Sequence, residues 1–240
     1  MPRVSRIARS TGWLAAFVMA LAVTSPTTAA YAEAEAPRSA DPARPVVLVH
    51  GWLGLPSNFD AMKKALTEAG IPAYTVLLLG QENVSNAKTI RAKVDEVSAA
   101  HAGSDVDLVG HSMGGLSTRY YLKQLGGTAR VHSYVSMGTS QYGYEGACAL
   151  PDLLGGQMCP GSDFLTGLND GDDTPGSVSY TTMWSTEDTL DAARLDGGAC
   201  FHEIAGVPHA DEPKSPQFIA AVRAALAGTC PGEFVDLPIG

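Results

Sequence analysis

The stretch VDLVGHSMGG, residues 106–115, decides the fold predicted for this chain. Its first four residues form an apolar run typical of a strand buried on both faces, and a helical pattern follows from Met113 to Leu125. Between the two, Gly110, Ser112 and Gly114 match the pattern G-x-S-x-G, which places a serine on a sharp strand-to-helix turn. Glycines flank this serine because side chains there would collide with neighbouring backbone. Ser112 is therefore a candidate nucleophile.

Strand-like and helical segments alternate on both sides of this stretch. The predicted strands are residues 46–49, 72–79, 106–109, 131–137, 178–184 and 200–204, and the predicted helices are residues 58–69, 87–102, 113–125 and 215–227. Such alternation predicts an α/β fold, with a mostly parallel twisted sheet and helices on both faces. Residues 138–176, rich in Gly, Asp and Pro, lack periodicity and predict a functional loop or a cover.

A serine hydroxyl becomes a good nucleophile only when a base removes its proton. In α/β hydrolases the partners follow the serine in the order acid, then histidine. His209 lies in the loop between the last predicted strand and the final helix, and Asp188 lies just past the preceding strand. We therefore expect Ser112, Asp188 and His209 to form a triad, with Glu187 and Asp191 as alternatives for the acid.

The carbonyl oxygen that becomes negative in the transition state needs hydrogen-bond donors. In such folds one donor is the backbone N–H of the residue after the nucleophile, which here is Met113. The other comes from the loop after the first buried strand, where HGWLG at residues 50–54 makes Trp52 the simplest choice. These two amides are the predicted oxyanion hole.

The first residues are predicted to be a targeting segment. Three arginines precede an uncharged apolar run, Trp13 to Val23, which is too short to span a membrane but fits a signal peptide. Cleavage after Ala30-Tyr31-Ala32 divides the chain into a signal peptide (1–32), a flexible leader (33–44) and one hydrolase domain (45–240). This predicts a secreted, extracellular protein, with a retained N-terminal anchor as the alternative.

The four cysteines all lie in the second half of the chain, at positions 148, 159, 200 and 230. Outside the cell an even number of cysteines suggests disulfides, here two bonds with three pairings to choose from. We favour Cys148–Cys159 and Cys200–Cys230 because each pair closes a modest loop. A zinc site is the alternative, but no C-x-x-C motif or Cys/His cluster supports it.

Composition narrows the range of partners. Lys+Arg 16 against Asp+Glu 25 gives a net charge of −9, which argues against nucleic acid, and 45% hydrophobic residues argue against a disordered chain. We expect no cofactor and no catalytic metal. Residues 169–173, NDGDD, offer oxygen ligands for a structural Ca²⁺ but lack the spacing of an EF-hand, so a solvated turn is the default.

Several of these segments resemble the small secreted bacterial lipases of the α/β-hydrolase superfamily, with their actinobacterial relatives. The matching segments are residues 45–59, 106–125, 170–182 and 206–209, and GHSMGG is the sharpest of them. The resemblance implies a lipase or esterase that hydrolyses carboxylic esters, including acylglycerols, with Ser112 as nucleophile, His209 as base and Asp188 as its partner. We expect a monomer that has an ester or lipid substrate, contacts lipid interfaces transiently and has no stable membrane span.

Two further functions stay open. A polyester hydrolase, a thioesterase or an amidase would use the same triad, so only substrate profiling separates them from an esterase. A protein of hydrolase fold that binds a ligand without turning it over would keep the G-x-S-x-G turn as a relic.

Overall fold

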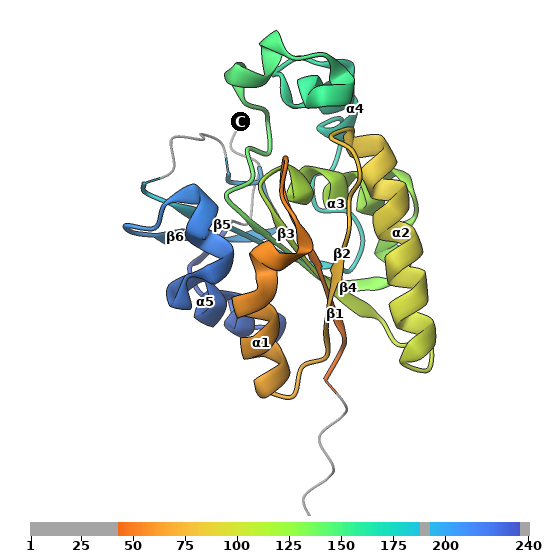
Figure 1. The fold of residues 1–240 in the computed structure, drawn as a ribbon, viewed down its shortest axis with the longest axis vertical. Coiled ribbons are helices and arrows are strands. Elements are labelled where there is room, and N and C mark those ends of the chain that lie inside the picture. Colours follow the sequence, from red (N-terminus) through yellow and green to blue (C-terminus); the bar gives the residue numbers. More distant parts are fainter. Residues whose placement is uncertain (1–42, 188–192, 236–240) are drawn as a thin grey trace, which may run out of the picture. The chain divides into compact units, whose positions relative to one another are not determined.

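The computed structural model describes residues 43–187 and 193–235, and the predicted signal peptide, most of the leader, Asp188 and Asp191 lie outside these ranges. The described residues form a seven-stranded sheet in the order β2-β1-β3-β4-β5-β6-β7 (Figure 1). The strands are β1 Val46–Val49, β2 Ala73–Val76, β3 Val106–His111, β4 Val131–Met137, β5 Ser179–Ser185, β6 Ala199–Ile204 and β7 Glu233–Val235. β1 to β6 pair in parallel, and β7 pairs antiparallel with β6.

Helices cover both faces of this sheet (Figure 1). The long helices are α1 Asp60–Glu68, α2 Asn83–Ala100, α3 Met113–Gln124 and α5 Pro216–Leu226. Side chains of α2 and α3 pack with Val47 and Val49 of β1 in one core cluster, and side chains of α1 and α5 pack with Val46 and Leu48 in the other. Alternate residues of β1 therefore face opposite layers, as the all-apolar run predicts.

The predicted α/β-hydrolase fold is confirmed, with differences at the ends of elements. The second strand ends at Val76, three residues earlier than predicted, and the second helix begins at Asn83, four residues earlier. A 3₁₀ turn with Pro56 in its first turn precedes α1, because proline is favoured where the backbone N–H has no helical acceptor. The edge strand β7 was not predicted, since three residues carry too little pattern to reveal a strand.

The segment between β4 and β5 is ordered rather than loose. It contains 3₁₀ turns at Glu145–Ala149, Asp152–Leu154 and Gly156–Met158, and the short helix α4 Asp163–Leu168, whose N-terminus is capped by Ser162. This helix was missed because six residues are too few for a periodic signal.

Both predicted disulfides are present, Cys148–Cys159 within this segment and Cys200–Cys230 near the end of the domain. Since all four cysteines are bonded in this way, the zinc alternative is wrong.

The strand order places a binding site at one point of the sheet. The chain runs from β1 outward to β2 and then returns to the other side of β1 as β3. In open α/β sheets, ligands bind outside the carboxyl ends of the strands at such a switch point. Here the residues that follow β1 and β3 are His50-Gly51-Trp52 and Ser112. The predicted nucleophile and the predicted oxyanion loop therefore meet at the switch point.

Within residues 43–187 and 193–235, no helix combines the length and hydropathy that a membrane crossing requires.

Candidate active site

Ser112 occupies the sharp turn between β3 and α3. Its backbone has φ 55° and ψ −129°, a conformation that costs a residue with a side chain roughly 1–3 kcal/mol. Three hydrogen bonds hold this conformation: the Ser112 N–H donates to Met137 O (2.9 Å), and the Ser112 carbonyl accepts from Gly115 N (3.0 Å) and Thr139 Oγ1 (2.9 Å). The strain is thus maintained by β4 and α3, and the side chain projects from the sheet edge.

The glycines of the motif are needed for close approach. A Cβ on Gly110 would lie 2.7 Å from Gly115 Cα, and a Cβ on Gly114 would lie 2.5 Å from the carbonyl oxygen of His50. Both distances are shorter than atoms tolerate, and the neighbours are backbone that cannot move aside. The two glycines let α3 pack directly on β3 and on the loop after β1.

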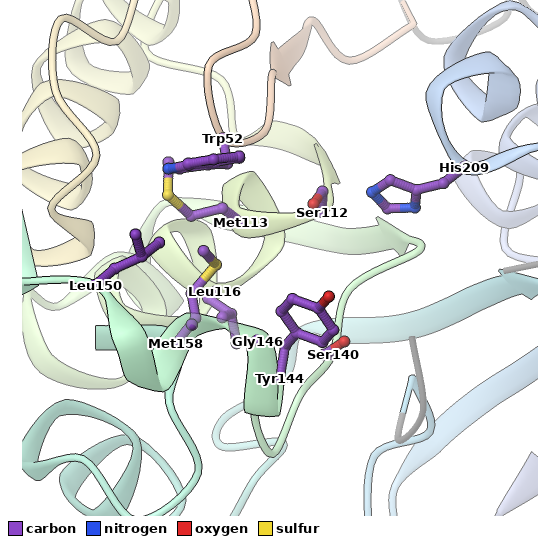
Figure 2. Close-up of a pocket in the computed structure, with 11 residues that line it drawn as sticks. Trp52, Ser112, Met113, Leu116, Ser140, Tyr144, Gly146, Leu150, Met158 and His209 are labelled. Atoms are coloured by element: carbon purple, nitrogen blue, oxygen red, sulfur yellow. The ribbon is translucent and has the colours of Figure 1, made fainter. Parts of the chain in front are cut away.

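Ser112 and His209 line the same cavity, which has a volume of about 420 Å³. Figure 2 shows the imidazole of His209 directed toward the Ser112 hydroxyl, although the two residues come from opposite halves of the domain. His209 begins a 3₁₀ turn, His209–Lys214, that follows β6 and precedes α5. The expected pairing of Ser112 with His209 is therefore compatible with the geometry.

The rest of the cavity is mostly apolar. Besides Ser112, Ser140 and His209, it is lined by Trp52, Met113, Leu116, Tyr144, Gly146, Ala147, Leu150 and Met158. Five of these come from the segment between β4 and β5, for which the sequence shows only an irregular stretch, and two of the five, Leu150 and Met158, lie inside the loop closed by Cys148–Cys159. The Trp52 indole donates a hydrogen bond to the Leu154 carbonyl (2.9 Å), so the loop after β1 is tied to this segment. A cavity of this size and lining suits a small apolar ligand held by a few polar groups.

Both predicted oxyanion donors lie at this cavity. Among the described residues, neither Trp52 N–H nor Met113 N–H has a hydrogen-bond acceptor in the protein. The Gly51 carbonyl accepts from Gly54 N–H (3.0 Å) and lies 3.0 Å from His50 Nδ1. Because carbonyl and N–H point in opposite directions across a trans peptide, these bonds turn Trp52 N–H away from His50.

His50 itself is fixed as one tautomer. Its Nε2 accepts from Leu78 N–H (3.1 Å), so the ring proton must be on Nδ1, which donates to Gly51 O. Burial lowers the pKa of His50, more than the hydrogen bond to Gly51 raises it, and this favours the neutral ring. Through these two hydrogen bonds His50 anchors the loop that carries Trp52.

His111 and Glu212 lie behind His209. The His111 ring lies against the His209 ring at a centroid distance of 4.6 Å, with the two planes tilted by 35°, and its Nε2 lies 3.0 Å from the His209 carbonyl oxygen. Burial is the main cause that lowers the pKa of His111 to about 3, so this ring is neutral and can donate that bond. The sequence analysis did not identify Glu212 as a candidate site residue. The signal that could have found it is its position three residues after His209, which is one turn of a 3₁₀ helix.

The structure does not describe the residue predicted to be the acid of the triad. Asp188 and its alternative Asp191 fall outside the described residues, while Glu187 is exposed on the turn after β5. That turn follows a strand adjacent to β4 and β6, at the edge of the sheet that carries Ser112 and His209. Asp188 therefore remains a prediction from chain order.

The acidic turn at residues 169–173 contacts a buried arginine. Arg119 of α3 is fully buried and donates to the Asp173 carboxylate, to Asn169 Oδ1 (2.7 Å) and to Gln141 Oε1 (3.2 Å). Asp173 also accepts from Tyr142 Oη (2.8 Å). One carboxylate of this turn, Asp173, thus already has a cationic partner in the protein and needs no Ca²⁺ to balance its charge.

Fold and site together define an α/β hydrolase, with a serine on the strand-to-helix turn after β3 and a histidine facing it across an apolar cavity. The protein is a hydrolase of the lipase, esterase or thioesterase type. Residues 45–189, more than half of the chain, match the palmitoyl protein thioesterase family. The chain belongs to this family.

Solved structures share the fold at low sequence identity. Bacillus licheniformis lipase BlEst2 in its mature form is 21% identical, with a TM-score of 0.68 over 79% of this chain and 94% of that one. Aspergillus fumigatus lipase B is 18% identical, with a TM-score of 0.65 over 79% of this chain but only 54% of the lipase. The lin2722 gene product of Listeria innocua is 14% identical, with a TM-score of 0.61 over 81% and 98%.

Proposed function

We propose that this protein is a serine hydrolase that cleaves carboxylic esters of apolar acyl groups through an acyl-enzyme. The observation that carries the proposal is the cavity in which Ser112 and His209 form the polar side and Trp52, Leu116, Leu150 and Met158 form the apolar side. An acyl chain fits the apolar side while its carbonyl carbon lies beside the serine oxygen.

The reaction then proceeds by two acyl transfers. His209 Nε2 takes the proton of Ser112 as Oγ bonds to the acyl carbon, and it returns this proton to the leaving group as the old bond breaks. Water repeats the sequence and releases the acid. The amides of Trp52 and Met113 stabilise the oxyanion, and Asp188 orients His209; each missing oxyanion donor costs about 3 kcal/mol of barrier.

Thioesters are the second substrate class, favoured by the match to the palmitoyl protein thioesterase family. Export to an oxidising compartment also belongs to the proposal and is supported by the two disulfides. Contact with lipid surfaces is supported by Leu53 and Leu154, which are exposed beside Trp52. A monomeric state without a cofactor is our expectation for the active form.

The direct test is a matched panel of p-nitrophenyl esters and acyl thioesters, with acyl chains from two to sixteen carbons, together with labelling by a fluorophosphonate. We expect one label per chain and turnover of both classes, with the ratio of kcat/KM values deciding the preferred leaving group. A folded protein that is neither labelled nor active on any member of the panel would refute the proposal and favour a ligand-binding role.

The acyl site has its own prediction. Leu150→Trp places a larger side chain in the apolar side of the cavity, so we expect kcat/KM for acyl chains of twelve carbons or more to fall at least about tenfold, which is roughly 1.4 kcal/mol. Turnover of acetyl and butyryl substrates should stay close to that of the wild type.

Leu153→Trp is the matched control, because Leu153 is three residues away, 71% exposed and not part of the cavity lining. Equal losses on short and long chains in Leu150→Trp would show that the acyl group binds elsewhere.

A further inference from the structure

Glu212 is a carboxylate in an unusual place. Its side chain is completely buried, yet it lies at the edge of the sheet beside the cavity. Its Oε2 is 3.9 Å from His209 Nδ1 and 3.4 Å from His111 Nε2. The same carboxylate also lies against the backbone just after β4, since a Cβ on Gly138 would overlap both Glu212 Oε2 and His209 Nδ1. The contact between Glu212 and His209 therefore depends on a glycine at position 138.

An ionised carboxylate away from water needs a nearby positive charge. Two imidazoles of the described residues lie within 4 Å of the Glu212 carboxylate, those of His111 and His209, and Lys214 lies on the same turn. The charged residues of α1 and α5, which pack against this turn, are exposed on the outer faces of those helices. His111 stays neutral, and Lys214 is paired with Asp211 at 3.3 Å.

His209, whose Nδ1 lies 3.9 Å from Glu212 Oε2, becomes an imidazolium when it takes the proton from Ser112. Glu212 lies on the Nδ1 side of the ring, opposite the nitrogen that faces the serine. A carboxylate there stabilises the positive ring without taking its proton, as the acid of a triad does.

We propose that Glu212 is a positioning residue for His209, a second carboxylate that stabilises the imidazolium in addition to Asp188. The inference rests on the proposed function. To the proposed mechanism it adds a carboxylate that comes from the turn of His209 itself rather than from the loop after β5. The serine proton still moves only between Oγ, His209 Nε2 and the leaving group, and Glu212 takes no part in the transfer.

The test compares Glu212→Gln, which keeps the shape and removes the charge, with Asp211→Asn, which removes the neighbouring exposed charge. In Glu212→Gln we expect kcat to fall about tenfold with KM unchanged, and the acidic limb of the kcat/KM pH profile to move to lower pH, because the imidazolium loses an anion that stabilises it. Asp211→Asn should leave both readouts close to those of the wild type. An unmoved acidic limb in folded Glu212→Gln overturns the proposal.

Two further variants complete the test. Asp188→Asn should retain some activity. Adding Glu212→Gln to it should lower this remaining activity by a further factor of about ten. If the double variant is as active as Asp188→Asn alone, the result contradicts a second carboxylate. If Glu212→Gln does not fold, Glu212→Asp replaces it: we expect a smaller shift of the limb in the same direction, and no shift would again overturn the proposal.

A readout without catalysis separates this inference from the proposed function. In Ser112→Ala, NMR titration of the His209 ring should show a midpoint that moves to lower pH when Glu212→Gln is added. A moved midpoint in a protein that hydrolyses no acyl substrate would uphold the contact between Glu212 and His209 while the proposed function fails.

Discussion

Ser112→Ala is expected to lower kcat/KM for acyl ester hydrolysis by at least about 10⁴-fold, the loss typical when a triad member is removed. The substitution deletes the hydroxyl oxygen that forms the acyl-enzyme in the proposed reaction, while it keeps the Cβ and hence the backbone at φ 55°. Labelling by a fluorophosphonate should disappear together with activity.

Stability should change little in this variant. The three hydrogen bonds that hold the turn involve the backbone of Ser112, so we expect a free energy of unfolding within about 0.5 kcal/mol of the wild type. Ser57→Ala, at an exposed serine just before α1, is the control and should retain full activity. Substantial turnover by folded Ser112→Ala would exclude Ser112 as the nucleophile.

Arg119→Ala should cause the largest loss of stability, about 3–5 kcal/mol. The buried guanidinium joins α3 to Gln141 after β4 and to Asn169 and Asp173 after α4, so its removal leaves the Asp173 carboxylate without its main counter-charge. For a domain of this size such a loss lowers the melting temperature by roughly 10 °C, which thermal unfolding would detect.

The pairing of Arg119 with Asp173 can be separated from simple loss of volume. Arg119→Met/Asp173→Asn removes both charges, and we expect it to be more stable than Arg119→Met alone. Arg91→Ala is the control, since Arg91 forms an exposed pair with Asp95 on α2 and its removal should change stability by less than about 1 kcal/mol. Equal losses of stability for Arg119→Ala and Arg91→Ala would show that the buried pair contributes no more to stability than an exposed pair.

Much of the fold could be predicted because its signals are local. The apolar runs at Val46–Val49 and Val131–Met137 became β1 and β4 with unchanged bounds, and the G-x-S-x-G turn placed Ser112 between a strand and a helix. The cysteine pairing also followed from short separations along the chain. The weakly periodic α4 and the three-residue β7 escaped because tertiary contacts, rather than their own sequence, stabilise them.

By itself the sequence determined the α/β class and the position of Ser112 on its turn, since both depend on neighbours along the chain; chain order predicted His209 as the base. Tertiary structure alone decided that Arg119 neutralises Asp173, that the segment closed by Cys148–Cys159 lines the cavity, and that Glu212 lies against His209. Burial and contact between distant residues set the charge and orientation of these groups, and no local pattern of residues encodes either.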